Sequence, residues 1–148
     1  MLNTILANLY ERDLRTLTEE VTQFKSEDDL WKTEGTIKNP SGNLVLHITG
    51  GLNHFFGATL AHNGYIRDRD LEFSKKEVKR TELLAGLEEV IPMVTQTLNA
   101  LTQEEMQAEF PIIFDGEKRP TMYVLVRLLA HLDYHLGQVN YLRRFLEK

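Results

Sequence analysis

The stretch His131-Leu132-Asp133-Tyr134-His135 lies in the middle of the C-terminal segment, residues 121–148. Two histidines four residues apart on a helix lie one turn apart on the same face. Mostly apolar residues continue that face at spacings of three and four: Val124, Leu128, Gln138 and Leu142. The segment is therefore predicted to be an amphipathic helix that carries both imidazoles on its inward face.

Burial of this histidine pair raises the question of what partners its ring nitrogens find. A buried imidazole needs a partner for each of its two nitrogens, and two imidazoles in one apolar stripe need more partners than a core normally supplies. A metal ion would meet this need, because the spacing lets a helix offer two nitrogen ligands to one ion. The alternative is a pair of core histidines bonded to ordinary protein neighbours.

Three further amphipathic segments precede this helix. They cover residues 2–24, residues 42–62, and a region that begins between residues 74 and 81 and ends near residue 101. Ser41 and Thr121 are the predicted N-caps of the second and fourth segments, and Pro92 is predicted to kink or break the third. Four such segments with two long connections predict an all-α four-helix bundle that forms one domain over residues 1–148.

The two long connections differ in character. Residues 65–73 carry charges of alternating sign, which predicts a solvated loop with local ion pairs, held at its ends by Tyr65 and Phe73. Residues 102–120 contain the apolar stretch 110–114 followed by Asp115-Gly116, which predicts an extended segment or a small hairpin.

Composition narrows the class of protein. The chain has 148 residues, of which 42% are hydrophobic and 26% charged, and this balance is typical of a soluble globular domain. Its net charge of −5 argues against a nucleic-acid partner. The chain has no cysteine, so a metal site must use nitrogen or oxygen ligands, and a cytoplasmic location is expected. We predict neither a signal peptide nor a membrane-spanning segment.

The second predicted helix carries two more histidines, His47 and His54, which are seven residues apart and point nearly the same way. Small residues surround them at positions 50, 51, 57 and 58. These small residues fit either close contact between helices or space for a ligand beside the histidines, and the sequence does not choose between the two. Bundles build metal sites from inward side chains on facing helices, so His47 or His54 could join His131 and His135.

Several established site patterns are absent from the sequence. A zinc-protease motif needs Glu directly after the first histidine, where this chain has Leu132. Asp133 is rotated to the far side of the helix and cannot replace it. A di-iron carboxylate site needs Glu three residues before a histidine, and the chain has none at those positions. There is also no glycine-rich phosphate loop and no nucleophile elbow.

Three segments of the chain resemble the DinB-like (DinB/YfiT) superfamily of bacterial four-helix bundles. They are PSGNLVLHI at residues 40–48, HLDYHLGQ at residues 131–138, and NHFFG at residues 53–57 followed by GYIRDRDLEF at residues 64–73. The resemblance covers nearly the whole chain. It implies a three-histidine site for a divalent metal, zinc or nickel, formed by His47, His131 and His135. It also implies a homodimer.

The same resemblance implies a chemistry. Characterised relatives include thiol-dependent S-transferases and a mycothiol-dependent isomerase, in which the metal activates a small thiol. Without cysteine in this chain, such a thiol would have to be a low-molecular-weight cofactor. Catalytic residues stay open, with His54, Tyr134 and Arg67 as candidates. Gln138, one turn from His135, is a candidate partner for a ligand imidazole.

Three functional hypotheses follow. The first is a metal-dependent enzyme of the thiol S-transferase or hydrolase type that acts on a small-molecule substrate. The second is a non-catalytic bundle that binds a metal or a small molecule as part of a stress response. In the third, the histidines are core residues and the bundle serves interactions with other proteins.

Overall fold

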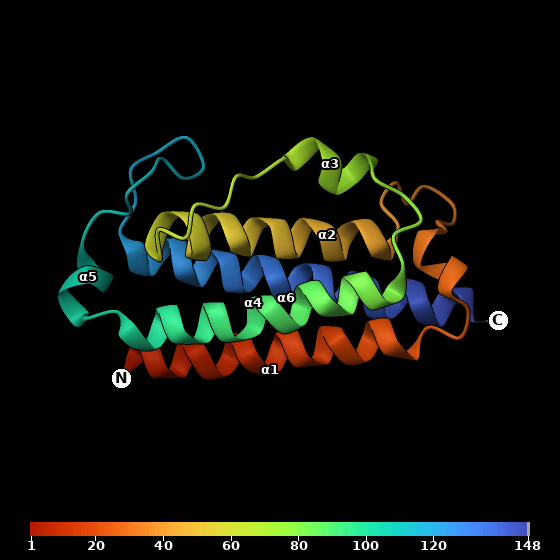
Figure 1. Cartoon of the computed structure of the whole chain (residues 1–148), viewed down its shortest axis with the longest axis horizontal. Helices are drawn as coiled ribbons and strands as arrows, with labels where there is room; N and C mark the ends of the chain where they lie inside the picture. Colours follow the sequence, from red (N-terminus) through yellow and green to blue (C-terminus); the bar gives the residue numbers. More distant parts are fainter. Residues whose placement is uncertain (148) are drawn as a thin grey trace.

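The computed structural model describes residues 1–147 and shows four long helices packed side by side (Figure 1). They are α1 (Leu2–Gln23), α2 (Ser41–Leu52), α4 (Arg80–Ala100) and α6 (Thr121–Leu146). Helix α1 packs against α4 and α6, and α2 packs against the same two helices. This arrangement confirms the predicted all-α four-helix bundle. No helix within the described residues is both long and apolar enough to cross a membrane.

The direction of the helices explains the longest connection. Helices α1 and α6 run one way along the bundle, and α2 and α4 run the other way (Figure 1). The chain therefore has to return along the whole bundle between the end of α2 and the start of α4. This return segment lies along the outer side of α2 and contains the short helix α3 (Arg69–Ser74) (Figure 1). Within residues 65–73, Arg67, Glu72 and Phe73 are at least partly buried, whereas the other residues are exposed as predicted.

Short elements complete the fold. A 3₁₀ helix, η1 (Glu27–Trp31), follows α1, and α5 (Gln103–Gln107) follows α4 with a capping box between Thr102 and Glu105. Asp115 and Gly116 have φ angles of 51° and 77°, and antiparallel bridges join Phe114 to Glu117 and Glu109 to Pro120. These values fit a tight hairpin turn, so the small hairpin predicted after residue 110 is present in short form.

Several predicted helix boundaries differ from the structure. Ser41 and Thr121 are the first helical residues and not the caps, because Pro40 and Pro120 take the cap positions. The second helix does not remain an α-helix to residue 62, since residues 53–60 form a π-helix, η2 (Asn53–Leu60). Helix α4 continues through Pro92 without a break. Pro92 is exposed, so a carbonyl group that loses its partner there can bond to water.

The core is formed by the apolar faces of the four helices. Tyr10, Leu14 and Leu17 of α1 are fully buried, as are Leu87 of α4 and Leu125 of α6. The Tyr10 hydroxyl donates a hydrogen bond of 2.5 Å to the carbonyl oxygen of Leu125, and burial raises the pKa of this hydroxyl. The phenol therefore stays neutral and holds α1 against α6.

A buried carboxylate adds a polar link between the same two helices. Glu20 of α1 accepts hydrogen bonds of 2.7 Å each from Nδ2 of Asn140 and Nε of Arg143, both on α6. The side chains of Glu20 and Arg143 are 9% and 12% exposed. Removing one partner from such a pair leaves the other charge buried without compensation, which is destabilising.

We therefore predict that Arg143→Ala lowers the free energy of unfolding by about 2 kcal/mol, because a charge-assisted hydrogen bond to Glu20 is lost. Urea denaturation measures this difference. The matched control is Arg144→Ala, whose exposed side chain stacks on Tyr141 and should change stability by less than about 0.5 kcal/mol. Equal effects of the two substitutions would contradict a structural role for the buried pair.

Candidate metal centre

Three histidine rings from two helices meet between α2 and α6. Nε2 of His131 lies 3.1 Å from Nε2 of His47 and 2.9 Å from Nε2 of His135. Each of the three offers a ring nitrogen, and these three atoms lie within 4.8 Å of one another. Helix α2 supplies His47, and α6 supplies the other two from adjacent turns. The rings selected from the sequence are thus brought together by the packing of α2 on α6.

Hydrogen bonds at the outer nitrogens fix the protonation of two of the rings. Nδ1 of His47 lies 3.0 Å from Oε1 of Glu72, and Nδ1 of His135 lies 2.7 Å from Oε1 of Gln138. Both partners are acceptors, so each Nδ1 carries a hydrogen and donates it. In a neutral ring the other nitrogen is then a lone pair. His47 and His135 therefore direct Nε2 lone pairs toward His131.

This arrangement leaves a shortage of hydrogens inside the cluster. A neutral His131 carries at most one hydrogen on Nε2, so it satisfies only one of the two lone pairs that face it. A fully charged ring is disfavoured, because burial and then the nearby His135, His47, Arg127 and Arg67 lower the pKa of His131 to about 4. Burial also lowers the pKa of His135, against the effect of Gln138. These shifts keep His131 and His135 neutral near pH 7.

The spacing of the rings suits a metal ion. Zinc bonds imidazole nitrogen at about 2.0–2.1 Å, so two ligands of a tetrahedral ion lie about 3.3 Å apart. The two measured separations, 3.1 and 2.9 Å, are a few tenths of an ångström shorter than that. Three imidazole nitrogens that face one another, two of them with lone pairs directed inward, are a suitable ligand set for a divalent ion, and they leave further coordination positions open. The cluster could therefore hold a metal ion.

Glu72 is the part of the site that the sequence reasoning missed. We interpreted residues 65–73 as a solvated run, yet Glu72 is only 5% exposed. Arg67 donates hydrogen bonds of 2.8 and 2.9 Å from Nε and Nη2 to the two carboxylate oxygens of Glu72. Burial raises the pKa of Glu72, but the bonds from Arg67 and His47 outweigh it and lower the pKa overall. Glu72 is therefore ionised and accepts the Nδ1 hydrogen of His47.

Two residues of α2 explain how Glu72 reaches His47. Gly50 lies beside the Glu72 carboxylate, and a Cβ at this position would overlap Oε2 of Glu72. The buried Asn43 donates hydrogen bonds of 2.9 and 2.8 Å to the carbonyl oxygens of Glu72 and Lys75. Asn43, His47 and Gly50 share one face of α2, at spacings of four and three. The small residue at position 50 thus serves close packing of the return segment against the histidine.

Ring packing adds to the support of His47. The Phe73 ring centroid lies 4.7 Å from that of His47, and the guanidinium of Arg69 lies over the Phe73 ring at 5.2 Å. Phe73 is therefore held in place as predicted for one end of the 65–73 segment. At the other end, Tyr65 is 37% exposed. The sequence contained a partial signal, because Gly50, three residues after His47, permits a close approach to this face of α2 without indicating which residue makes it.

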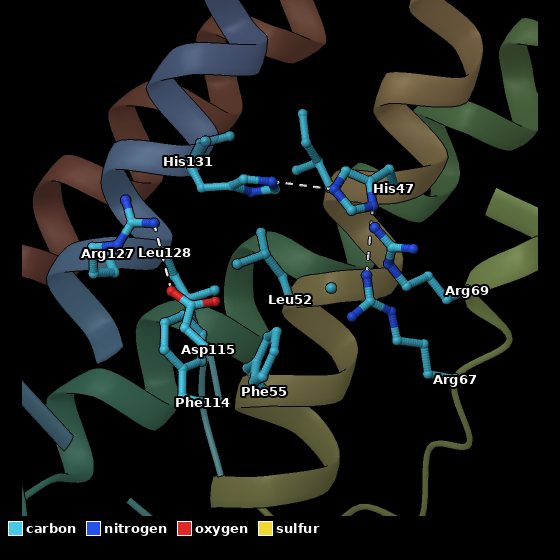
Figure 2. Close-up of a pocket in the computed structure, with 13 residues that line it drawn as sticks. His47, Leu52, Phe55, Arg67, Arg69, Phe114, Asp115, Arg127, Leu128 and His131 are labelled. Atoms are coloured by element: carbon cyan, nitrogen blue, oxygen red, sulfur yellow. Dashed lines mark hydrogen bonds and ion pairs between the residues drawn. The ribbon is translucent and has the colours of Figure 1, made fainter. Parts of the chain in front are cut away.

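The three candidate catalytic residues lie at different places relative to the histidine cluster. Tyr134 is exposed and its ring centroid lies 5.3 Å from that of His135. Arg67 bonds Glu72, and its Nη2 also lies 3.5 Å from Nδ1 of His47 (Figure 2). His54 lies outside the three-ring cluster and packs against Phe55. Seven helical residues advance the chain by about 10 Å, which separates His54 from His47 along the axis. Burial and the charge of Arg67 lower the pKa of His54, although Glu72 opposes this.

Asp133 lies on the side of α6 that faces α1. Asp13 of α1 is a neighbouring carboxyl group, and burial together with this neighbour raises the pKa of Asp133 to about 6. The side chain therefore takes no part in the histidine cluster, in agreement with its predicted rotation away from His131 and His135.

Two cavities adjoin the rings. The smaller, about 160 Å³, is lined by His47 and His131 together with apolar residues and three arginines, shown in Figure 2. The larger, about 520 Å³, is lined by His135, Gln138 and mainly apolar and aromatic side chains, among them Tyr134 and Tyr141. The histidine cluster thus borders two separate spaces of different size and polarity.

Comparisons with known proteins agree with the fold. The structure resembles a DinB-like protein, YjoA, from Bacillus subtilis with a TM-score of 0.72 and 17% identity, over 97% of this chain and 92% of that one. It also resembles a DinB-like protein from Bacillus cereus with a TM-score of 0.76 and 14% identity, over 96% of this chain and 91% of that one. At such identities the likeness shows the fold. The search of curated proteins found no match.

The comparison with family models identifies the family of the chain. The model of a protein family of unknown function, DUF1572, matches residues 2–148, which is nearly the whole chain. The chain therefore belongs to the DUF1572 family, and its fold is that of the two DinB-like proteins.

Proposed function

We propose that this protein is a metal-dependent enzyme whose ion is held by His47, His131 and His135. The observation that carries the proposal is the set of inward Nε2 lone pairs, which Glu72 and Gln138 impose from outside. Carboxylates and amides that bind the outer nitrogen of a histidine orient the ring and raise its basicity toward a metal. Zinc or nickel suits three imidazoles, because both ions accept nitrogen ligands.

The reaction class follows from what surrounds the cluster. A divalent ion held there would supply Lewis-acid activation of a weak nucleophile, either a small thiol or water. Two cavities border the rings, and a transfer between two substrates needs two binding spaces, whereas hydrolysis needs one organic substrate. This favours a thiol S-transferase over a hydrolase. Because the chain contains no cysteine, the thiol belongs to a low-molecular-weight cofactor.

The protein side chains have separable roles in this proposal. Glu72 keeps the hydrogen of His47 on Nδ1, and Arg67 keeps Glu72 ionised through its two hydrogen bonds. The larger cavity, with Tyr134 at His135, is the space for the thiol cofactor, since it has the volume for it. The smaller cavity at His47 and His131 receives the second substrate. His54 lies outside both linings, which leaves it without contact to either substrate.

A homodimer is part of the same proposal. Tyr134, Tyr141 and Phe145 lie on α6 and are 64%, 75% and 45% exposed. Aromatic side chains are enriched where proteins associate. A second copy packed along this surface would cover the larger cavity, which these three residues help to line.

The proposed function predicts two linked losses on His131→Ala. Purified wild-type protein, loaded with zinc or nickel, should contain about one equivalent of metal and turn over an electrophile in the presence of a small thiol. The variant should lose both the metal and the turnover, because its remaining two ligands are too few to hold the ion. Elemental analysis and a panel of thiols and electrophiles measure these two properties.

His62→Ala is the control, since His62 is exposed and lies outside the cluster. Metal content that is unchanged by His131→Ala would contradict the three-histidine site. Bound metal without turnover across the whole panel would contradict an enzyme and favour the alternative, a non-catalytic metal-binding or small-molecule-binding bundle.

The contact between Glu72 and His47 gives a second prediction, which compares substitutions of two adjacent glycines, Gly50 and Gly51. Gly50→Ala introduces a methyl group that overlaps the Glu72 carboxylate, so Glu72 must move away from His47. Metal affinity should fall by about 10–100-fold, the usual effect of losing such a partner. In Gly51→Ala the nearest atom outside the helix is Nη2 of Arg67 at 3.5 Å, an ordinary contact, so affinity should be retained. Competition with a chromophoric chelator measures both values. Equal affinities in the two variants would show that Glu72 does not support the site.

A further inference from the structure

The smaller cavity concentrates positive charge in an otherwise acidic protein. Arg67, Arg69 and Arg127 line it, although the chain as a whole has a net charge of −5. Asp115 is the carboxylate in the lining, and Glu72 contacts Arg67 from outside it. Three guanidinium groups therefore face two carboxylates at this one place, beside the nitrogens of His47 and His131.

The three arginines are not equally engaged. Arg67 is committed to Glu72 through two hydrogen bonds and is 15% exposed. Arg69 stacks on Phe73 and forms no ion pair within residues 1–147. Arg127 approaches Asp115 at 3.6 Å, and both side chains are about half exposed. Such an exposed pair contributes little, so Arg127 can exchange Asp115 for another anion at small cost.

Figure 2 shows how the charged side chains are arranged around the cavity. Arg127 comes from α6 and lies near Asp115 of the hairpin, whereas Arg67 and Arg69 come from the return segment and lie beside His47. The wall between them is apolar, with Leu52, Phe55 and Phe114 among its side chains. A ligand of this cavity therefore needs an apolar part and a negative group.

Volume limits the size of that ligand. A cavity of about 150 Å³ holds a molecule as large as benzene, which has six non-hydrogen atoms. The cavity here is about 160 Å³, so a short carboxylate or a phosphate group fits in it. Guanidinium groups match both oxyanions, because their paired N–H donors bind two oxygens at once.

We infer that this cavity binds a small oxyanion, a carboxylate or a phosphate, and that Arg69 and Arg127 hold its charge. Under the proposed function, on which this assignment rests, the oxyanion is the negative group of the second substrate. Its charge places the rest of the molecule against the apolar wall, next to His47 and His131. The enzyme would then select small anionic substrates over neutral ones of the same shape.

Binding measurements on the zinc-loaded protein test this inference. The probes are inorganic phosphate, propionate, and propionamide as the neutral analogue of propionate, each titrated by calorimetry. Phosphate or propionate should bind at least tenfold more tightly than propionamide, since the neutral probe cannot form charge-assisted bonds. The anion that binds more tightly identifies the class. Equal binding of propionate and propionamide, with no binding of phosphate, would overturn the inference.

Three substitutions locate the anion. Arg69→Gln and Arg127→Gln should each weaken anion binding about tenfold at unchanged zinc content. Asp115→Asn should strengthen it, because it removes a competing carboxylate, and asparagine tolerates the φ of 51° at this position. Arg144→Gln, on α6 but outside the cavity, should leave it unchanged. Anion affinity that none of the three cavity variants changes would overturn the inference.

The metal-free protein separates this inference from the proposed function. Anion binding that depends on Arg69 and Arg127, in a protein that holds no zinc after loading, would support the oxyanion cavity and contradict the metal site. Bound zinc, together with anion binding that neither arginine substitution changes, would support the metal site and contradict the oxyanion cavity.

Discussion

The hydrogen bond from Nδ1 of His47 to Glu72 is the contact on which the rest of the site depends. It fixes which nitrogen of His47 carries the hydrogen, and so it turns a lone pair toward His131 and His135. The bond requires an ionised carboxylate in a buried position, which Arg67 stabilises. It also requires that the return segment approach α2 closely, which Gly50 and Asn43 permit. A single hydrogen bond thus connects the path of the return segment to the protonation of the histidine cluster.

The bundle topology makes this contact available. Because α2 and α4 run in the same direction, the connection between them has to cross the whole length of the bundle (Figure 1). A shorter connection would not pass His47. The charged residues of this connection are therefore divided between two environments: Glu72 is buried against α2, while Asp70 stays in solvent. The same segment also provides Arg69 for the smaller cavity.

Much of this structure was predictable from sequence, and the site residues that were missed have a common cause. Helical periodicity predicted the four long helices. The spacing of His131 and His135 predicted the face of the last helix that carries the site. The resemblance to the DinB-like superfamily implied that His47 joins them. Glu72, Arg69, Arg127 and Asp115 were missed because their positions depend on how two connections pack on the bundle. Charge alternation along residues 65–73 does not reveal which carboxylate is buried. The limits of helix η2 were missed as well, since residue propensities do not distinguish a π-helix from an α-helix.

The central claim is that three imidazoles from two helices bind one ion, and X-ray absorption spectroscopy of the zinc-loaded protein tests it most directly. The account predicts three nitrogen ligands at about 2.0–2.1 Å, with the multiple scattering that imidazole rings produce. A spectrum without imidazole scattering, or with oxygen ligands alone, would contradict it.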